Sequence, residues 1–175
     1  GINSLKGQAI EASLEYARWI FNHFKQQGTN ADGAELAEVL KLLETHMSAE
    51  DRTPGEMAMI GSNIHLLYAV DKAWLKEHAG SIFPLGSAGS SSIPIEWAAW
   101  NAFLLSSHPH IEFYKIFEKQ FVYAVQQAPS IQAPKHGSAH NPVQRLGEHL
   151  AILYMRGELP LDDERLSLRK FIAET

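Results

Sequence analysis

The sequence predicts an all-α protein of about eight helices arranged in antiparallel pairs. Along most of the chain, apolar residues recur at spacings of three and four, the repeat of one face of a helix. We find no segment in which apolar and polar residues alternate with a period of two between turns, as they would in a half-buried strand. Proline- and glycine-containing breaks divide the periodic segments into lengths typical of globular helices.

The first predicted pair spans residues 3–47. Asn3 and Ser4 are good N-caps, and the first helix is expected to end near Gly28. A second helix carries Asp32 in its first turn. The apolar stripe of the first helix consists of Ile10, Leu14, Ala17, Phe21 and Phe24, and that of the second consists of Leu36, Val39, Leu40, Leu43 and Met47.

The second predicted pair begins where SAEDRTPGE, residues 48–56, interrupts the pattern. Pro54 suits the first turn of a helix, because its missing N–H would have no partner there. Val70 and Asp71 interrupt again, and DKAWLKEHAGSIF, residues 71–83, forms a shorter helix. The apolar face of the helix after Pro54 consists of Met57, Ile60, Ile64, Leu67 and Tyr68.

Two segments rich in turn-forming residues separate the remaining helices. PLGSAGSSSIP, residues 84–94, and APSIQAPKHGSAHNP, residues 128–142, are predicted to be surface loops. Between them lie one helix with Trp97, Trp100 and Leu104 on a face, a turn at His108-Pro109-His110, and a helix that stacks Phe113, Phe117, Phe121 and Ala124. After the second loop, a helix carries Leu146, Leu150, Leu153 and Tyr154, and a last one starts at Asp162, Asp163 and Glu164.

The predicted pairs start near residues 3, 54, 94 and 142, which are 51, 40 and 48 residues apart. HEAT-type repeats of two helices have periods of roughly 40–47 residues. The spacing therefore favours a HEAT-like α-solenoid, with a closed helical bundle as the alternative. We expect residues 1–175 to form a single helical domain, excised from a longer protein, because Gly1 looks like the scar of a removed tag and the helical pattern is still running at the end.

Composition narrows the function classes. A hydrophobic content of 45% and a charged content of 20% are those of an ordinary globular protein. The net charge of −5 argues against a nucleic-acid partner, and no apolar run reaches the roughly 20 residues needed to cross a bilayer. The chain has no cysteine, which removes disulfides and thiol chemistry and suits a cytoplasmic location.

The histidines are the candidate metal ligands. His108, His110 and Glu112 are closely spaced imidazole and carboxylate groups of the kind that zinc and iron bind. They fall at a turn between helices, however, and no HExxH motif completes a ligand set. His136 and His140 are four residues apart, but Gly137, Ser138 and the flanking prolines argue against the helix that would align them. We therefore predict neither a metal nor a cofactor.

Three other patterns have structural interpretations. Glu148 and His149 are adjacent, so on a helix they point about 100° apart and cannot act as an acid–base pair. Arg145, three residues before Glu148, predicts a surface ion pair instead, while His149 can reach another helix. GSAGSSS lacks the spacing and lysine of a phosphate-binding loop. The tryptophans Trp19, Trp74, Trp97 and Trp100 fit helix faces, as core residues or interface anchors.

Three segments resemble the helical C-terminal regions of very large bacterial proteins, some of them NTPase-like or SIR2-like proteins linked to phage defence. They are 145-RLGEHLAILYMRGELPLDD-163, 2-INSLKGQAIEASLEYARWI-20 and 95-IEWAAWNAFL-104. The resemblance covers most of the chain, and its motifs are helix-packing patterns. It implies a helical domain within a larger protein and no catalytic residue in this segment.

The sequence thus predicts a non-catalytic helical scaffold or sensor domain that binds other domains of its parent protein or a protein partner. The exposed part of the helix with Trp97 and Trp100, and the loops 84–94 and 128–142, are the predicted binding surface. A small metal-dependent enzyme centred on His108, His110, Glu112 and His149 is one alternative. A dimerisation module is the other.

Overall fold

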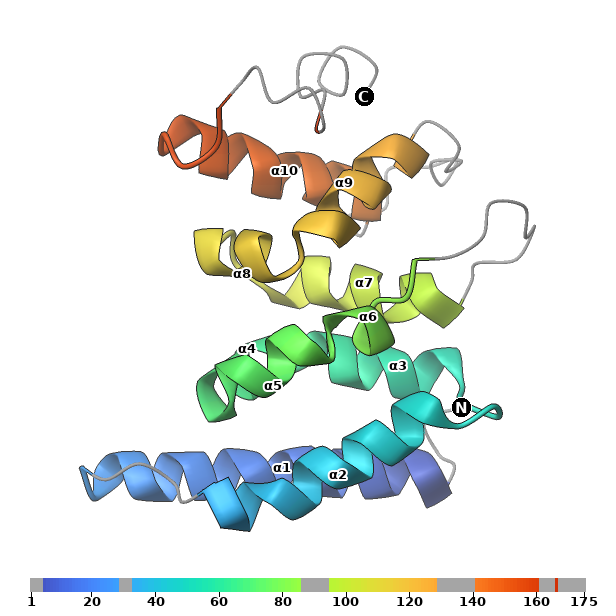
Figure 1. The fold of residues 1–175 in the computed structure, drawn as a ribbon, viewed down its shortest axis with the longest axis vertical. Coiled ribbons are helices and arrows are strands. Elements are labelled where there is room, and N and C mark those ends of the chain that lie inside the picture. The colour runs from blue at the N-terminus through green and yellow to red at the C-terminus, as the bar shows by residue number, and fades with distance from the viewer. Residues whose placement is uncertain (1–4, 29–32, 86–94, 129–140, 161–165, 167–175) are drawn as a thin grey trace. The chain divides into compact units, whose positions relative to one another are not determined.

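The computed structural model describes residues 5–28, 33–85, 95–128, 141–160 and 166 (Figure 1). All regular secondary structure within these residues is helical, which confirms the predicted all-α class. The contacts of the chain group into two compact units, Gly1–Phe103 and Leu104–Thr175. Whether these units act as the single domain expected from the sequence stays a prediction.

The described helices number ten, not about eight. Unit 1 contains α1 (Leu5–Gln26), α2 (Gly33–Ser48), α3 (Pro54–Ser62), α4 (Ile64–Val70), α5 (Lys72–Glu77), α6 (Ala79–Ile82) and the first part of α7 (Ile95–Ser106). Unit 2 contains the end of α7, then α8 (Ile111–Ile116), α9 (Glu118–Gln127) and α10 (Pro142–Met155).

The count differs because three predicted helices are each interrupted by one residue. Asn63 separates α3 from α4, His78 separates α5 from α6, and Phe117 separates α8 from α9. All three residues have φ between −92° and −108° and ψ between 6° and 25°. This backbone region is sparsely populated and lies next to the helical one, so a residue there bends the chain without changing which side chains face the core.

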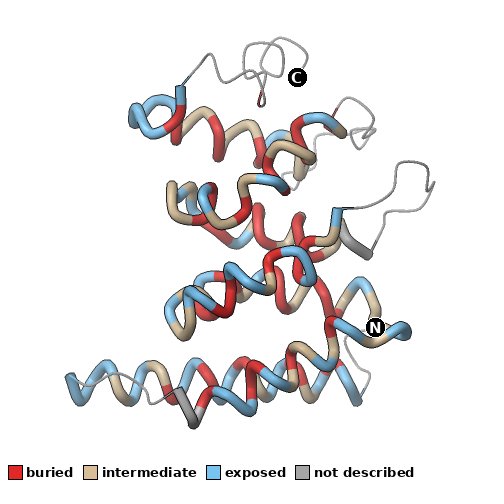
Figure 2. The backbone as a smooth tube through the Cα atoms, in the orientation of Figure 1, coloured by how far each residue is buried: buried red, intermediate tan, exposed pale blue. Residues whose placement is uncertain are grey.

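The predicted apolar faces of unit 1 lie in its core. Ile10, Leu14 and Ala17 of α1 are buried, and all five predicted residues of α2 are buried as well. Phe21 and Phe24 are only half-buried, and Ile20 continues the buried stripe in their place. Buried and exposed positions alternate along α1 as the helix turns (Figure 2). Helix α1 packs against α2, α3 and α4, and α2 also contacts α6.

Pro54 lies in the first turn of α3, as the sequence predicted, and the two residues around it cap the helix. Thr53 accepts a hydrogen bond from the backbone N–H of Glu56, and the Glu56 carboxylate accepts one from the N–H of Thr53 at 2.9 Å. This reciprocal capping box satisfies two backbone donors that the helix itself cannot.

Phe83, Trp100 and Phe103 form an aromatic cluster in the core of unit 1. Trp100 meets Phe83 edge to face with ring centroids 5.3 Å apart, and Phe103 lies 5.4 Å from Trp100 and 5.6 Å from Phe83. Such offset and edge-to-face pairs stabilise a core beyond the area that they bury.

In unit 2, side-chain caps and a glycine define the ends of α10. Asn141 accepts hydrogen bonds from the backbone N–H groups of Val143 and Gln144, and Pro142 occupies the first turn. Gly157 follows the helix with φ +70°, and the N–H of Glu158 donates to the carbonyl of Leu153 at 3.0 Å, as in a Schellman motif. The predicted faces of α8, α9 and α10 are buried: Phe113, Phe117, Phe121, Ala124, Leu146, Leu150 and Leu153.

Several predicted features lie outside the described residues. They are the caps Asn3 and Ser4, the acid Asp32, most of the loops 84–94 and 128–142 with His136 and His140, and the last helix beginning at Asp162. Tyr154, which was predicted to share the apolar stripe of α10, is exposed.

Candidate interaction site

The turn that carries His108, His110 and Glu112 forms the start of a helix. His110 is the N-cap of α8, and its Nδ1 accepts a hydrogen bond from the backbone N–H of Glu112 at 3.2 Å. The Glu112 carboxylate in turn accepts a hydrogen bond from Lys115 at 2.9 Å. Both side chains therefore already have local partners at the first turn of the helix.

His149 lies in the core of unit 2. Its side chain is 2% exposed, and its Nε2 lies 3.2 Å from the carbonyl oxygen of Leu104, to which the ring N–H donates. Burial lowers the pKa of His149 to about 4, outweighing the hydrogen bonds to the backbone of Leu104 and Ser107, which raise it. The ring is neutral at neutral pH, and it satisfies a carbonyl in the last turn of α7.

Within the part of the chain that the structure describes, no group of three or more histidine, aspartate and glutamate side chains could hold a metal ion. His108, His110, Glu112 and His149 all belong to that part, so they do not converge into the centre that the metal-dependent alternative requires.

The ion pair predicted between Arg145 and Glu148 is confirmed. The Arg145 guanidinium lies 2.5 Å from the Glu148 carboxylate, and Gln144 also donates to that carboxylate at 3.1 Å. The hydrogen bond from Arg145 is the main reason that the pKa of Glu148 lies below its usual value. Glu148 and His149 thus face different surroundings, as expected for adjacent residues on one helix.

The predicted binding surface around Trp97 and Trp100 is mostly internal. Trp100 is 3% exposed and belongs to the aromatic cluster with Phe83 and Phe103. Trp97 is half-buried. Of the two interpretations that the sequence left open for Trp100, core residue and interface anchor, the structure confirms the first, so Trp100 does not belong to an exposed binding surface.

Two exposed aromatic residues lie instead on one face of α1, and both are more exposed than Tyr154 of α10. Trp19 is 62% exposed and Tyr16 is 50% exposed, and their rings stack with centroids 6.3 Å apart. On its other side, Trp19 stacks on His23, with centroids 5.4 Å apart and planes 12° from parallel. We call Tyr16, Trp19 and His23 the aromatic ladder.

One end of the aromatic ladder is held by Gln27. The side-chain nitrogen of Gln27 lies 2.9 Å from Nε2 of His23. An amide nitrogen only donates, so His23 is the acceptor in this contact. His23 also meets Phe24 edge to face, with centroids 5.8 Å apart, so the exposed ladder continues into the half-buried part of the helix.

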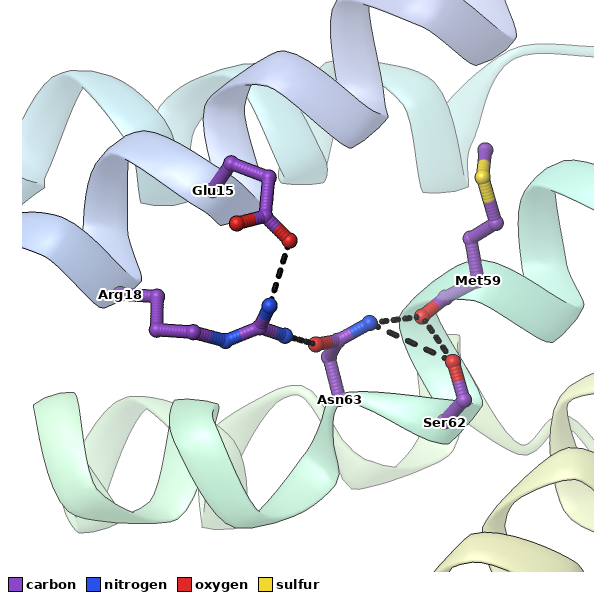
Figure 3. Close-up of polar contacts among 5 residues, drawn as sticks. All are labelled: Glu15, Arg18, Met59, Ser62 and Asn63. Carbon is purple, nitrogen blue, oxygen red and sulfur yellow. Dashed lines mark hydrogen bonds and ion pairs between the residues drawn. The ribbon is translucent and has the colours of Figure 1, made fainter.

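Beside the ladder, Arg18 ties α1 to the break between α3 and α4 (Figure 3). Its guanidinium donates to the Glu15 carboxylate and, at 2.7 Å, to the side-chain oxygen of Asn63. The amide nitrogen of Asn63 donates to the carbonyl of Met59 at 2.8 Å. This network fixes α1 to the rest of unit 1 through Arg18 and leaves the ladder exposed.

The aromatic ladder could have been recognised from the sequence. Tyr16, Trp19 and His23 are spaced by three and four, so they share a face, and that face is opposite the stripe of Ile10, Leu14 and Ala17. The spacing of the tryptophans alone predicts for Trp19 only a place on a helix face. The relevant signal was that two apolar stripes occupy one helix, and only one of them can face the core.

Comparison of the chain with models of protein families, with curated proteins and with solved structures finds no match. None of the described helices combines the length and the apolar character that spanning a membrane requires.

Proposed function

We propose that this chain is a non-catalytic helical scaffold that binds a protein, or another domain of a larger bacterial protein, through the aromatic ladder on α1. The observation that supports the proposal is the stack of Tyr16, Trp19 and His23, in which Trp19 is 62% exposed, whereas Trp74 and Trp100 of the same unit are buried. A single exposed apolar residue needs no explanation, but a contiguous exposed aromatic surface marks an interaction site.

The chemistry of the ladder suits a protein partner. Tryptophan and tyrosine dominate the binding energy of protein interfaces, because they offer a large rigid surface together with one polar group. Stacking on one another orders the three rings before binding, so little conformational entropy is lost when a partner covers them.

The proposal also concerns the place of this chain within a larger protein. We also propose that the chain stands beside other domains in a cytoplasmic protein, and what supports this is the resemblance of residues 2–20, 95–104 and 145–163 to helical regions of large bacterial proteins. Antiparallel helix pairs stacked as in HEAT repeats would leave the outer faces of their helices available to the next domain or to a partner.

Site-specific photo-crosslinking in the native cell tests this function. A photoreactive amino acid in place of Trp19 is expected to crosslink one defined protein or domain, identified by mass spectrometry. The same amino acid in place of Glu38, an exposed residue of α2, is the matched control and is expected not to capture that product. Loss of the product in Tyr16→Ala would link it to the ladder.

Two results would contradict the proposal. One is equal crosslinking from positions 19 and 38. The other is stoichiometric zinc binding that disappears in His110→Ala, which would support the histidine-centred enzyme instead.

A further inference from the structure

The exposed rings of α1 belong to a longer stripe on the same face of the helix. Ala9 in this stripe is half-buried, and the other residues are exposed, Leu5 to 86%. The centre of the stripe lies roughly 140° around the helix from the centre of the buried residues of α1, which pack against the rest of unit 1. Helix α1 therefore presents a second, largely apolar face to solvent. We call it the outer stripe, and it consists of Leu5, Ala9, Ala12, Tyr16, Trp19 and His23.

The residues of the outer stripe follow one another at intervals of four, three, four, three and four. The mean interval of about 3.5 is that of the a and d positions of a coiled coil, at which two helices pack side by side. On a straight helix such a stripe drifts by about 20° in every seven residues, so a second helix that crosses at about 20° stays in contact with it. An extended chain or an irregular surface does not require this interval. The spacing thus matches a helix as the occupant of the outer stripe.

We propose that the outer stripe binds a basic amphipathic α-helix, which packs lengthwise along α1 from Leu5 to His23. This inference rests on the proposed interaction function and specifies the element of the partner that makes the contact. The bound helix belongs to another protein or to another domain, and its own apolar residues recur with the same mean interval.

The sizes of the side chains specify the bound helix further. Ala9 and Ala12 are small, whereas Tyr16 and Trp19, in the turns that follow, are large. Because the side chains of packed helices interdigitate, a small residue on one helix leaves room for a large one on the other. The bound helix therefore carries large apolar residues opposite the two alanines and small residues opposite the two rings.

The charge of unit 1 indicates that the bound helix is basic. Residues 1–103 hold twelve acidic and seven basic side chains, so unit 1 attracts a basic helix and repels a second copy of itself. On α1, Glu15 is the charged residue closest to Trp19 around the helix, at about 40°. Because the Glu15 carboxylate already accepts a hydrogen bond from Arg18, a lysine or arginine beside it adds only modestly to the general attraction.

The contact is too small to hold the bound helix by itself. The outer stripe is about 27 Å long and one helix wide, and covering it buries less than the roughly 1,200 Å² of a stable interface. Further contacts of the partner, or a covalent link to the same chain, hold the helix in place. A helix that is part of a larger partner or domain meets this requirement, and a free peptide does not.

Photo-crosslinking at three positions of the outer stripe tests whether the occupant is a helix. A small diazirine-bearing amino acid is placed in turn at positions 5, 12 and 19 of the protein in its native cell, and the captured residues are mapped by mass spectrometry. Each step of seven residues along α1 covers about 10.5 Å. The captured residue should move by about seven positions along a bound helix at each step, against about three along an extended chain. Position 25, exposed but roughly 160° around α1 from the outer stripe, is the matched control and should not capture this helix.

Two pairs of variants test size and charge, with capture from position 19 as the measurement. Ala12→Phe should reduce capture about tenfold, because the ring fills the room left for a large residue of the bound helix, and Lys25→Phe should leave capture unchanged. Glu15→Lys should reduce capture about threefold, and more than Glu38→Lys, which makes the same change of net charge on the exposed face of α2. Thermal melting of each variant checks that the fold is retained.

The outcomes separate this inference from the proposed function. Capture of a second copy of this chain, captured residues that do not advance by about seven, or stronger capture by Ala12→Phe would each overturn the basic helix. If position 19 still captures one defined protein in those cases, the interaction function stands and only the kind of partner element is wrong. Absence of any captured product from positions 5, 12 and 19 would contradict both.

Discussion

Gly61 in α3 lies directly against the carbonyl oxygen of Ala99 in α7. A Cβ atom added at Gly61 would stand 2.1 Å from that oxygen and 2.8 Å from the Cα of Ala99. Neither is the end of a flexible side chain, so both helices would have to move apart. The missing side chain of Gly61 is therefore what allows α3 and α7 to approach so closely within unit 1.

We expect Gly61→Ala to lower the free energy of unfolding by about 3 kcal/mol, because the added methyl group forces backbone shifts in a packed core. Chemical denaturation of the purified variant measures this. Gly80→Ala is the matched control, since a Cβ there meets nothing within 4 Å and alanine favours the helical conformation of α6. Equal effects of the two substitutions would mean that the α3–α7 contact does not limit stability.

We expect the protein to lose stability at mildly acid pH because His149 is buried in its neutral form. Its pKa is about 4 in the folded protein and about 6.5 in the unfolded chain, where it is exposed. The stability contributed by the neutral ring is complete above pH 6.5. It is lost as the pH falls toward 4, because only the unfolded chain takes up the proton, and the loss approaches about 3 kcal/mol.

Urea denaturation at pH 7 and pH 5 checks this prediction. His149→Gln removes the titrating group but keeps an N–H donor near the carbonyl of Leu104. The variant should show a smaller difference between the two pH values, by about 2 kcal/mol. The lowered pKa of Glu148 affects the free energy of unfolding mainly where carboxylates usually titrate and below. It therefore adds little to the difference between pH 7 and pH 5. An identical pH dependence in the variant would show that His149 is not the group responsible.

Glu44 supports a buried tryptophan from a neighbouring helix. The indole N–H of Trp74 in α5 donates to the Glu44 carboxylate of α2 at 2.7 Å, and Trp74 is 8% exposed. Glu44→Ala should lower the free energy of unfolding by about 1–2 kcal/mol, because a buried donor loses its acceptor. Glu44→Gln retains an acceptor and should cost less, and Glu77→Ala, on the exposed side of α5, should have almost no effect. Comparable losses for Glu44→Ala and Glu77→Ala would rule out this role.

Truncation of Trp100 should destabilise the protein far more than truncation of Trp19. Trp100→Ala empties the aromatic cluster in unit 1 and should lower the free energy of unfolding by about 3–5 kcal/mol. Trp19→Ala removes a ring that is mostly in water and should cost less than about 1 kcal/mol. Thermal and urea denaturation of both variants compare them. If Trp19→Ala were as damaging as Trp100→Ala, the ladder would serve the fold.

The sequence predicted the helical faces well because burial selects apolar residues at helical spacing. Leu36, Val39, Leu40, Leu43 and Met47 of α2 are all buried, as the pattern indicated. The interruptions at Asn63, His78 and Phe117 escaped prediction. One residue with φ near −100° leaves the periodic pattern almost unchanged, and only Asn63 among the three is a residue with a strong preference for helix ends.

The candidate site was predicted less well, because periodicity does not say which face of an apolar helix is covered. Trp100 and Trp19 have similar sequence settings, yet one is in the core and the other is in water. The close approach of Gly61 to Ala99 is also invisible in the sequence, since it joins residues far apart along the chain. By contrast, the ion pair of Arg145 and Glu148 followed from their spacing on one helix.

Hydroxyl-radical footprinting of Trp19 tests most directly whether the aromatic ladder is used for binding. In the isolated chain, diluted until it is monomeric, Trp19 should be oxidised readily and Trp100 should be protected, in keeping with their exposures of 62% and 3%. In the native assembly, which is the chain together with its partner in the cell, we expect Trp19 to become protected while the oxidation of Trp100 is unchanged. Equal oxidation of Trp19 in the diluted chain and in the native assembly would contradict it.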